Sequence, residues 1–167
     1  FQALFGRDSG GLLHCYRCED AHTIVVALGS VIGTIKDTVD AMRDEGERIG
    51  VLGITSFRPF PLAAVREALV HAERVVVLEK SFSVGLGGIV ANDVRMAMTG
   101  TRRHGYTIVA GLGGRAITQA SLTRGEKLVE IIHWWEDYAE RNNMEMNNNP
   151  SPGNKLGGLT TILEKSL

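Results

Sequence analysis

Two cysteines, Cys15 and Cys18, stand three positions apart near the start of the chain and are the only ones in its 167 residues. Thiols at this spacing can close a reversible disulfide, or supply two of the four ligands that a structural zinc site requires. His14 and His22 lie nearby, but the sequence has no second cysteine pair. Residues 12–18 are predicted to be extended, whereas a low thiol pKa is favoured at a helix N-terminus. We expect ordinary reduced cysteines, with a metal or redox role as the alternative.

Two glycine-rich segments are only partial matches to nucleotide-binding loops. In the first, Gly85–Gly88, the residue two positions on is Val90, where a dinucleotide-binding fingerprint needs Gly or Ala. The second, residues 111–116, does fit G-x-G-x-x-A, but it follows the last predicted strand. The acidic residue that would hold a ribose should then end another strand about twenty residues further on, and that region is predicted to be helical. We therefore predict that these glycines allow close backbone approach.

Hydroxyl, cationic and glycine residues follow each predicted strand and form the remaining candidate site. Arg58, Lys80 and Arg115 lie beside predicted helix starts, where they could receive an anion or contact a partner. Two prolines stiffen the segment around Arg58, which gives either a rigid connection or a directed contact. Because no carboxylate–histidine or Ser/His/Asp grouping accompanies these residues, we expect a binding or docking edge without catalytic residues or metal ligands. The candidate ligand or interface residues are Ser30, Ser56, Arg58, Lys80, Ser81, Gly113 and Arg115.

Four repeats of one local plan must position these residues. A Val/Ile/Leu-rich run, a Gly, Ser or Pro corner and a segment of helical periodicity recur along residues 23–46, 49–72 and 74–97, and a fourth run begins at Tyr106. Apolar runs without alternation are typical of strands covered on both faces. Right-handed connections then predict a three-layer α/β fold with a mostly parallel twisted sheet and helices on both faces. All four corners would meet at the carboxyl edge of the sheet.

Composition limits the possible functions. The chain has 44% hydrophobic residues, enough to bury a sizeable core, and its net charge is −1 from 18 basic and 19 acidic residues. The basic residues do not cluster, so we expect no nucleic-acid and no membrane-surface partner. No apolar run is long enough to span a bilayer and no signal peptide is apparent, which predicts a cytoplasmic location. The sequence begins with Phe1, from which we expect a fragment or a processed chain.

Four segments, residues 23–30, 33–40, 56–61 and 110–115, occur in order at compatible spacing and resemble pyruvate:ferredoxin oxidoreductase and related 2-oxoacid:ferredoxin oxidoreductases. The resemblance covers residues ~1–118. It implies the transketolase C-terminal-like domain, called domain II, of the alpha subunit. It also implies partners, namely the other domains or subunits of such an enzyme in an oligomeric assembly.

The resemblance places the cofactors of that family elsewhere in the parent complex. Thiamine pyrophosphate and magnesium sit between other domains of the family, and iron–sulfur clusters pass electrons to ferredoxin. This chain lacks the Gly-Asp-Gly start of a thiamine-pyrophosphate motif, and its two cysteines cannot ligate a cluster that needs four. We therefore expect no cofactor bound by this chain itself, and an accessory role in packing the catalytic assembly.

The last part of the chain differs in character. Residues 127–141 are predicted to form an amphipathic helix in which Trp134 and Trp135 are core or interface anchors. A loop-forming stretch follows, and Thr161 and Glu164 have capping-box spacing just before the sequence stops, which predicts a truncated C-terminus. The expected organisation is a linker or edge segment at 1–22, an α/β domain at 23–120, and a helix with a truncated tail at 121–167.

The tail resembles a second family. Residues 134–138, 149–155, 157–161 and 164–167 are similar to altronate and galactarate dehydratases, which remove water from sugar acids with a divalent metal. This resemblance covers residues ~123–167 and implies sugar-acid contacts, although a structural role is preferred without the rest of that site. The implied contact residues are Asn149, Ser151, Asn154, Lys155, Thr160 and Glu164.

Three hypotheses follow for the function. We favour an accessory domain of a thiamine-dependent 2-oxoacid:ferredoxin oxidoreductase that carries an attached foreign segment and has no turnover alone. The alternatives are a fragment of a metal-dependent altronate or galactarate dehydratase, or an inactive fusion of the two.

Overall fold

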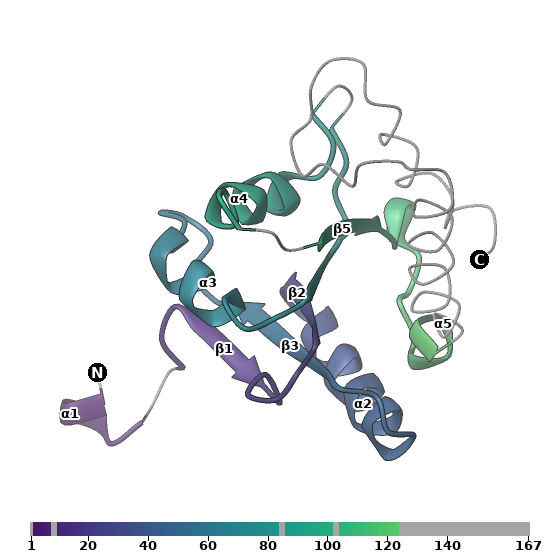
Figure 1. The fold of residues 1–167 in the computed structure, drawn as a ribbon, viewed down its shortest axis with the longest axis horizontal. Coiled ribbons are helices and arrows are strands. Elements are labelled where there is room, and N and C mark those ends of the chain that lie inside the picture. Colours follow the sequence, from purple (N-terminus) through teal and green to yellow (C-terminus); the bar gives the residue numbers. More distant parts are fainter. Residues whose placement is uncertain (1, 8–9, 84–85, 102–103, 124–167) are drawn as a thin grey trace.

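A computed structural model describes residues 2–7, 10–83, 86–101 and 104–123 of the chain. These residues form a five-stranded sheet with helices on both faces (Figure 1). The strands β2 to β5 run parallel, and β1 pairs antiparallel with β3. The spatial order is β1-β3-β2-β4-β5, with the bounds β1 (Leu13–Tyr16), β2 (Thr23–Leu28), β3 (Ile49–Ile54), β4 (Arg74–Glu79) and β5 (His104–Val109). The predicted mostly parallel three-layer fold is confirmed.

The helices divide between the two faces as right-handed connections require. One face carries α2 (Val31–Asp44) together with α5 (Gln119–Thr123), and the other carries α3 (Leu62–Leu69) and α4 (Ile89–Ala97). A short 3-10 helix, η1 (Leu112–Gly114), follows β5. The first helix, α1 (Gln2–Phe5), stands away from the sheet in Figure 1.

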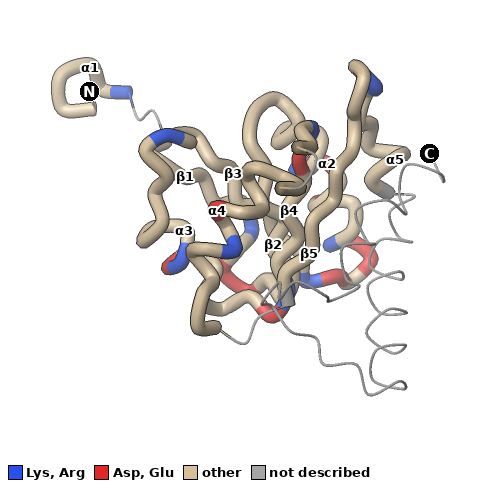
Figure 2. Tube along the Cα trace, turned by 90° about the horizontal axis from the view of Figure 1, so that it is seen from above, with Lys and Arg blue, Asp and Glu red and all other residues tan. Residues whose placement is uncertain are grey.

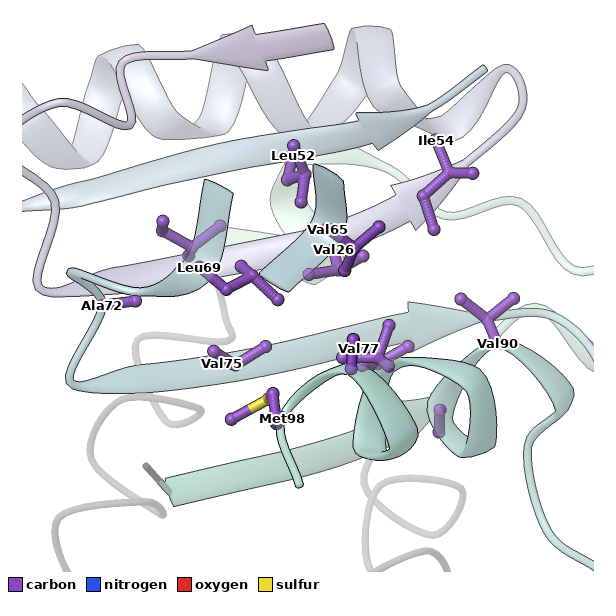
Figure 3. Close-up of a cluster of buried hydrophobic side chains, with 14 of the residues drawn as sticks. Val26, Leu52, Ile54, Val65, Leu69, Ala72, Val75, Val77, Val90 and Met98 are labelled. Atoms are coloured by element: carbon purple, nitrogen blue, oxygen red, sulfur yellow. The ribbon is translucent and has the colours of Figure 1, made fainter. Parts of the chain in front are cut away.

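Two apolar cores lie on the two sides of the sheet. All six residues of β3 are buried, because its alternate side chains point into different cores: Leu52 packs toward α3 and α4, whereas Val51 packs toward α2. Figure 3 shows the first core, in which Val65 and Leu69 of α3 meet the sheet. Apolar runs without alternation are explained by this double cover.

One helix begins earlier than its apolar spacing predicts. The periodicity becomes helical from Thr34, but α2 starts at Val31. Val31 and Ile35 lie one turn apart and both are buried, so the extra turn adds to the core. Gly46 follows the end of this helix with a φ of 99° and donates its N–H to the carbonyl of Arg43 at 2.9 Å, as is usual for a glycine just after a helix.

The strand order fixes where the corners lie. The connection from β2 leads outward to β3, and the next returns past β2 to β4, so the direction of winding reverses between β2 and β4. The corners therefore lie side by side along the carboxyl edge, in the order of the strands that they follow: β3, β2, β4 and β5. In open α/β sheets, ligands and partners are bound at this edge near such a reversal.

Several predictions concern residues outside the described part. These are the amphipathic helix at 127–141, both tryptophans, and the tail residues Asn149, Ser151, Asn154, Lys155, Thr160 and Glu164. Among the residues that the structure does describe, no helix has the length and apolar character needed to cross a membrane.

Candidate functional site

The seven candidate residues all lie at the carboxyl edge of the parallel strands. Ser30 precedes α2 and is exposed, without a side-chain hydrogen bond to the helix start. Ser56 follows β3 and is half-buried, and Gly113 lies in η1 with a φ of 66°. Within the described residues, their contacts join them to the nearest corner or helix and do not bring them together around one ligand-sized point.

Arg58 is held in a defined direction, toward α4. Its guanidinium carbon lies 3.8 Å from the centre of the Phe57 ring, and its Nη1 donates to the Phe57 carbonyl at 3.0 Å. The same Nη1 lies 2.8 Å from Oδ2 of Asp93, although this oxygen receives no aligned hydrogen bond. The contact is thus chiefly electrostatic, and the charge of Arg58 is compensated within the chain.

Lys80 and Arg115 are the other two cations of this edge, and both are exposed. The Lys80 side chain passes over Gly111, where an added Cβ would lie 3.2 Å from its Cε. Gly111 has a φ of 77°, so glycine suits this corner for its backbone as well. Within the described part of the chain, neither Lys80 nor Arg115 belongs to an ion pair. Their charge is therefore available to a partner.

Sequence reasoning missed Glu79, the last residue of β4. Its side chain is buried, at 6% exposure, and the carboxylate accepts hydrogen bonds from the N–H groups of Val90 at 3.0 Å and Ala91 at 3.2 Å. The Ser81 hydroxyl also lies 3.4 Å from it. A carboxylate at this position satisfies free N–H groups of α4 and interacts favourably with the helix dipole. The start of α4 is thus occupied by a group of the chain itself.

Gly88 makes room for this carboxylate. A Cβ built at Gly88 would lie 1.7 Å from Oε1 of Glu79, although its φ of −76° is open to any residue. We predicted that these glycines allow close approach of backbone; at Gly88 the approaching group is a side chain. An acidic residue directly after the buried run 75–78 was the available signal for Glu79.

Exposed apolar side chains gather at the same edge. Leu28 is the last residue of β2, and Ile89 is the first residue of α4. Leu12 lies beside the end of β3, because its carbonyl accepts hydrogen bonds from the N–H groups of Thr55 at 3.0 Å and Ser56 at 3.2 Å. Six of the ten large exposed apolar residues in the described part belong here, so the clustering is marked. We name these six the apolar rim: Leu12, Leu28, Phe82, Leu86, Ile89 and Leu112.

The charges separate the two edges of the sheet. Segments 28–31, 55–61, 80–89 and 110–116 contain no Asp or Glu, so the charged residues of these four corners are all cationic. The loops at the opposite edge carry both signs, and Asp20 in one of them pairs with Arg43 near the end of α2 at 2.6 Å. Figure 2 colours the acidic and basic positions along the described chain. Among the described residues, the edge that carries the apolar rim thus has fewer internal ion pairs than the opposite edge.

These features define an α/β domain with an exposed apolar edge beside cationic side chains. The family model described as pyruvate:ferredoxin oxidoreductase core domain II matches residues 21–122, and the chain belongs to this family. The model described as D-galactarate/altronate dehydratase, C-terminal, matches residues 111–167. Both resemblances seen in the sequence are confirmed.

Curated relatives match the same region. Pyruvate synthase subunit PorA of Methanothermobacter thermautotrophicus is 38% identical over 122 residues, which are 73% of this chain and 31% of the relative. PorA of Methanosarcina barkeri is 40% identical over 129 residues, covering 74% of this chain and 32% of the relative. Ketoisovalerate oxidoreductase subunit VorA of Pyrococcus horikoshii is 35% identical over 120 residues, which are 71% of this chain and 30% of the relative. The chain thus spans less than a third of the length of these relatives.

A solved structure has the same fold. It is a 2-oxoglutarate:ferredoxin oxidoreductase from Magnetococcus marinus with 2-oxoglutarate, coenzyme A and succinyl-CoA bound. The TM-score is 0.55 at 20% identity, over 75% of this chain and 20% of that one. At this identity the likeness concerns the fold alone.

Proposed function

We propose that this chain is an accessory domain of a 2-oxoacid:ferredoxin oxidoreductase, and that its apolar rim docks against another domain or subunit of that enzyme. The observation that carries the proposal is the clustering of exposed apolar side chains at one edge of the sheet. The family membership and the PorA relatives support pyruvate as the 2-oxoacid. The parent enzyme would work in the cytoplasm, with thiamine pyrophosphate, magnesium and iron–sulfur clusters held by its other parts.

The composition of the apolar rim suggests the chemistry of its partner. An apolar centre surrounded by polar or charged residues is the usual arrangement of an interface between domains. Because Lys80 and Arg115 border the rim and the four corner segments contain no Asp or Glu, a matching surface would be apolar with carboxylates at its margin. The apolar contact supplies most of the affinity, and the charges orient the two surfaces.

The arrangement of polar groups supports docking over catalysis. Glu79, the carboxylate at this edge, is committed to the start of α4 by two backbone hydrogen bonds. Arg58 is paired with Asp93. We therefore propose that the chain has no turnover of its own, and 2-oxoacid-dependent reduction of an electron acceptor by the isolated chain would contradict this.

Leu86→Glu should weaken binding of this chain to the remaining subunits of the pyruvate:ferredoxin oxidoreductase from the same organism. Leu86 is 62% exposed, so the substitution should leave the fold intact. Burying a leucine contributes about 1.5–3 kcal/mol, which corresponds to a loss of affinity of roughly ten- to a hundredfold. Isothermal titration calorimetry measures the dissociation constants.

Met96→Glu is the matched control for this experiment. Met96 is also apolar and 59% exposed, and it lies in α4, but it does not belong to the apolar rim. We expect its binding to equal that of the unmodified chain. Equal affinity for Leu86→Glu and the unmodified chain, or no binding by any variant, would rule out docking through the rim.

The match of residues 111–167 favours a second candidate function, a fragment of a sugar-acid dehydratase. This function requires the chain to bind a divalent metal together with altronate or galactarate. Calorimetric titration with magnesium and galactarate distinguishes the two candidates. If neither ligand releases heat of binding, the dehydratase candidate is removed.

A further inference from the structure

The two cysteines lie where an edge strand turns away from the sheet. Cys15 belongs to β1, opposite Leu52 of β3, and is exposed. Cys18 comes just after the strand and is half-buried against the core on the side of α3 and α4. Between them, Arg17 has a φ of 53° and is the one non-glycine residue with positive φ in the described part. This left-handed residue bends the chain so that Cys18 lies on the same face of the sheet as Cys15, whose cross-strand neighbour Leu52 belongs to the core that Cys18 contacts.

The turn is fixed from two sides. On one side, Nη2 of Arg43 donates to the Arg17 carbonyl at 2.8 Å, and the same guanidinium binds both carboxylate oxygens of Asp20 at 2.6 and 3.2 Å. On the other side lies Gly50, where an added Cβ would approach the Arg17 carbonyl oxygen to 2.4 Å. The geometry that brings the thiols together is therefore preorganised.

The environments of the two thiols differ. The Cys18 sulfur lies 3.3 Å from the Val51 carbonyl oxygen and 3.7 Å from the Tyr16 carbonyl oxygen, so this thiol lies inside the turn. The hydrogen bond from Cys18 lowers the pKa of the Cys15 thiol to about 7, and the same bond raises the pKa of Cys18. The thiolate is the reactive form of cysteine. The exposed Cys15 is thus the nucleophile of the pair.

A metal role fits this cluster less well. Tyr16 and His14 alternate with Cys15 along β1 and point to the other face, where Nε2 of His14 contacts Nζ of Lys36 at 2.9 Å. In the part of the chain that the structure describes, no three His, Cys, Asp or Glu residues are grouped to hold a metal ion. Two thiols alone leave a zinc ion two ligands short.

We propose that Cys15 and Cys18 are a redox-active dithiol, which small-molecule disulfides such as oxidised glutathione convert to an intramolecular disulfide. The Cys15 thiolate attacks one sulfur of glutathione disulfide, forms a mixed disulfide and releases one glutathione thiolate. The Cys18 thiol, no longer bonded to a thiolate, loses its proton and attacks the Cys15 sulfur, which releases the second glutathione. Two protein thiols are oxidised, and one glutathione disulfide is reduced to two glutathiones.

The test is incubation of the full chain with oxidised glutathione, followed by intact mass measurement. The unmodified chain should lose two hydrogen atoms and carry no glutathione. Cys18→Ala should keep one glutathione as a stable mixed disulfide, and Cys15→Ala should react far more slowly. Because these are the only cysteines, each mass has one interpretation. A stable glutathione adduct on the unmodified chain, a disulfide-linked dimer, or two unreacted thiols would overturn the proposal.

The pH dependence of alkylation gives a second, independent measurement, which begins with the unmodified chain. Iodoacetamide reacts with the thiolate, so the rate at Cys15 should rise with pH around a midpoint of about 7. Cys18→Ala removes the donor and should move this midpoint upward, toward about 8.5. An unchanged midpoint in Cys18→Ala would show that the two thiols are not coupled, and would also overturn the proposal.

Discussion

Glu79→Ala should destabilise the domain by about 3 kcal/mol, because it leaves two backbone N–H groups at the start of α4 without their acceptor. Gly88→Ala should destabilise the domain by a similar amount, because its added methyl group would overlap the carboxylate of Glu79. The two residues occupy the same space, so their effects should not add. In Glu79→Ala/Gly88→Ala the methyl group finds room, and we expect the double variant to be more stable than the sum predicts by about 1–3 kcal/mol.

Urea unfolding of the four proteins of this cycle measures the coupling. Gly87→Ala is the matched control, because Gly87 is the adjacent glycine and an added Cβ there meets no atom within 4 Å. Its φ of 80° makes alanine unfavourable for a backbone reason, by about 1–2 kcal/mol. That effect should add to the effect of Glu79→Ala. Equal coupling for both glycines would contradict the contact between Glu79 and Gly88.

Glu79 also connects stability to the proposed interface. The segment between β4 and α4 contains Phe82 and Leu86, two members of the apolar rim. A carboxylate that fixes the end of β4 to the start of α4 limits the positions of both side chains. We infer that Glu79 acts on docking as a positioning residue, through the order of this segment.

Gly50→Ala should cost about 3 kcal/mol or more, because overpacking against atoms that cannot move is strongly unfavourable. The added Cβ would lie 2.4 Å from the Arg17 carbonyl oxygen, 2.9 Å from its carbon and 3.1 Å from the Cα of Cys18. All three are backbone atoms of the turn after β1. The expected result is separation of this turn from β3, seen as a lower urea midpoint and faster alkylation of Cys18.

Gly53→Ala in the same strand provides the comparison. Its Cβ would lie 2.9 Å from Cδ1 of Ile32, which is the end of a flexible side chain. This neighbour can rotate away, so the cost should be about 1 kcal/mol. Should Gly50→Ala prove no less stable than Gly53→Ala, the close packing of the turn on β3 would be incorrect.

The sequence was sufficient to predict the parallel strands and their cover. Runs such as residues 75–78 are continuously apolar, and this pattern has few other solutions in a chain of this length. The strand order was not predicted, because local patterns do not say whether β4 lies beyond β3 or beside β2. Residues 13–16 were predicted to be extended, but their antiparallel pairing with β3 depends on contacts distant in sequence.

In the candidate site, too, the features that depend on local sequence could be predicted, and those that depend on contacts distant in sequence could not. The corners at the carboxyl edge follow from the parallel strands, and the prolines around Arg58 indicated either a rigid connection or a directed contact. Its partner Asp93 belongs to another helix and could not be identified from the sequence. Glu79 was missed because a carboxylate after a strand is usually solvated, and only the arrival of α4 makes it a buried cap.

The antiparallel direction of β1 has a consequence for how the domain is tethered. Because β1 runs opposite to its neighbour, the chain enters the sheet at the carboxyl edge, beside the end of β3 and next to the apolar rim. A partner domain joined through the residues ahead of β1 would be held close to the docking surface. Short flexible linkers give effective concentrations in the millimolar range, on the order of 10⁻³ M. An interface too weak to persist between separate molecules could therefore remain closed within one chain.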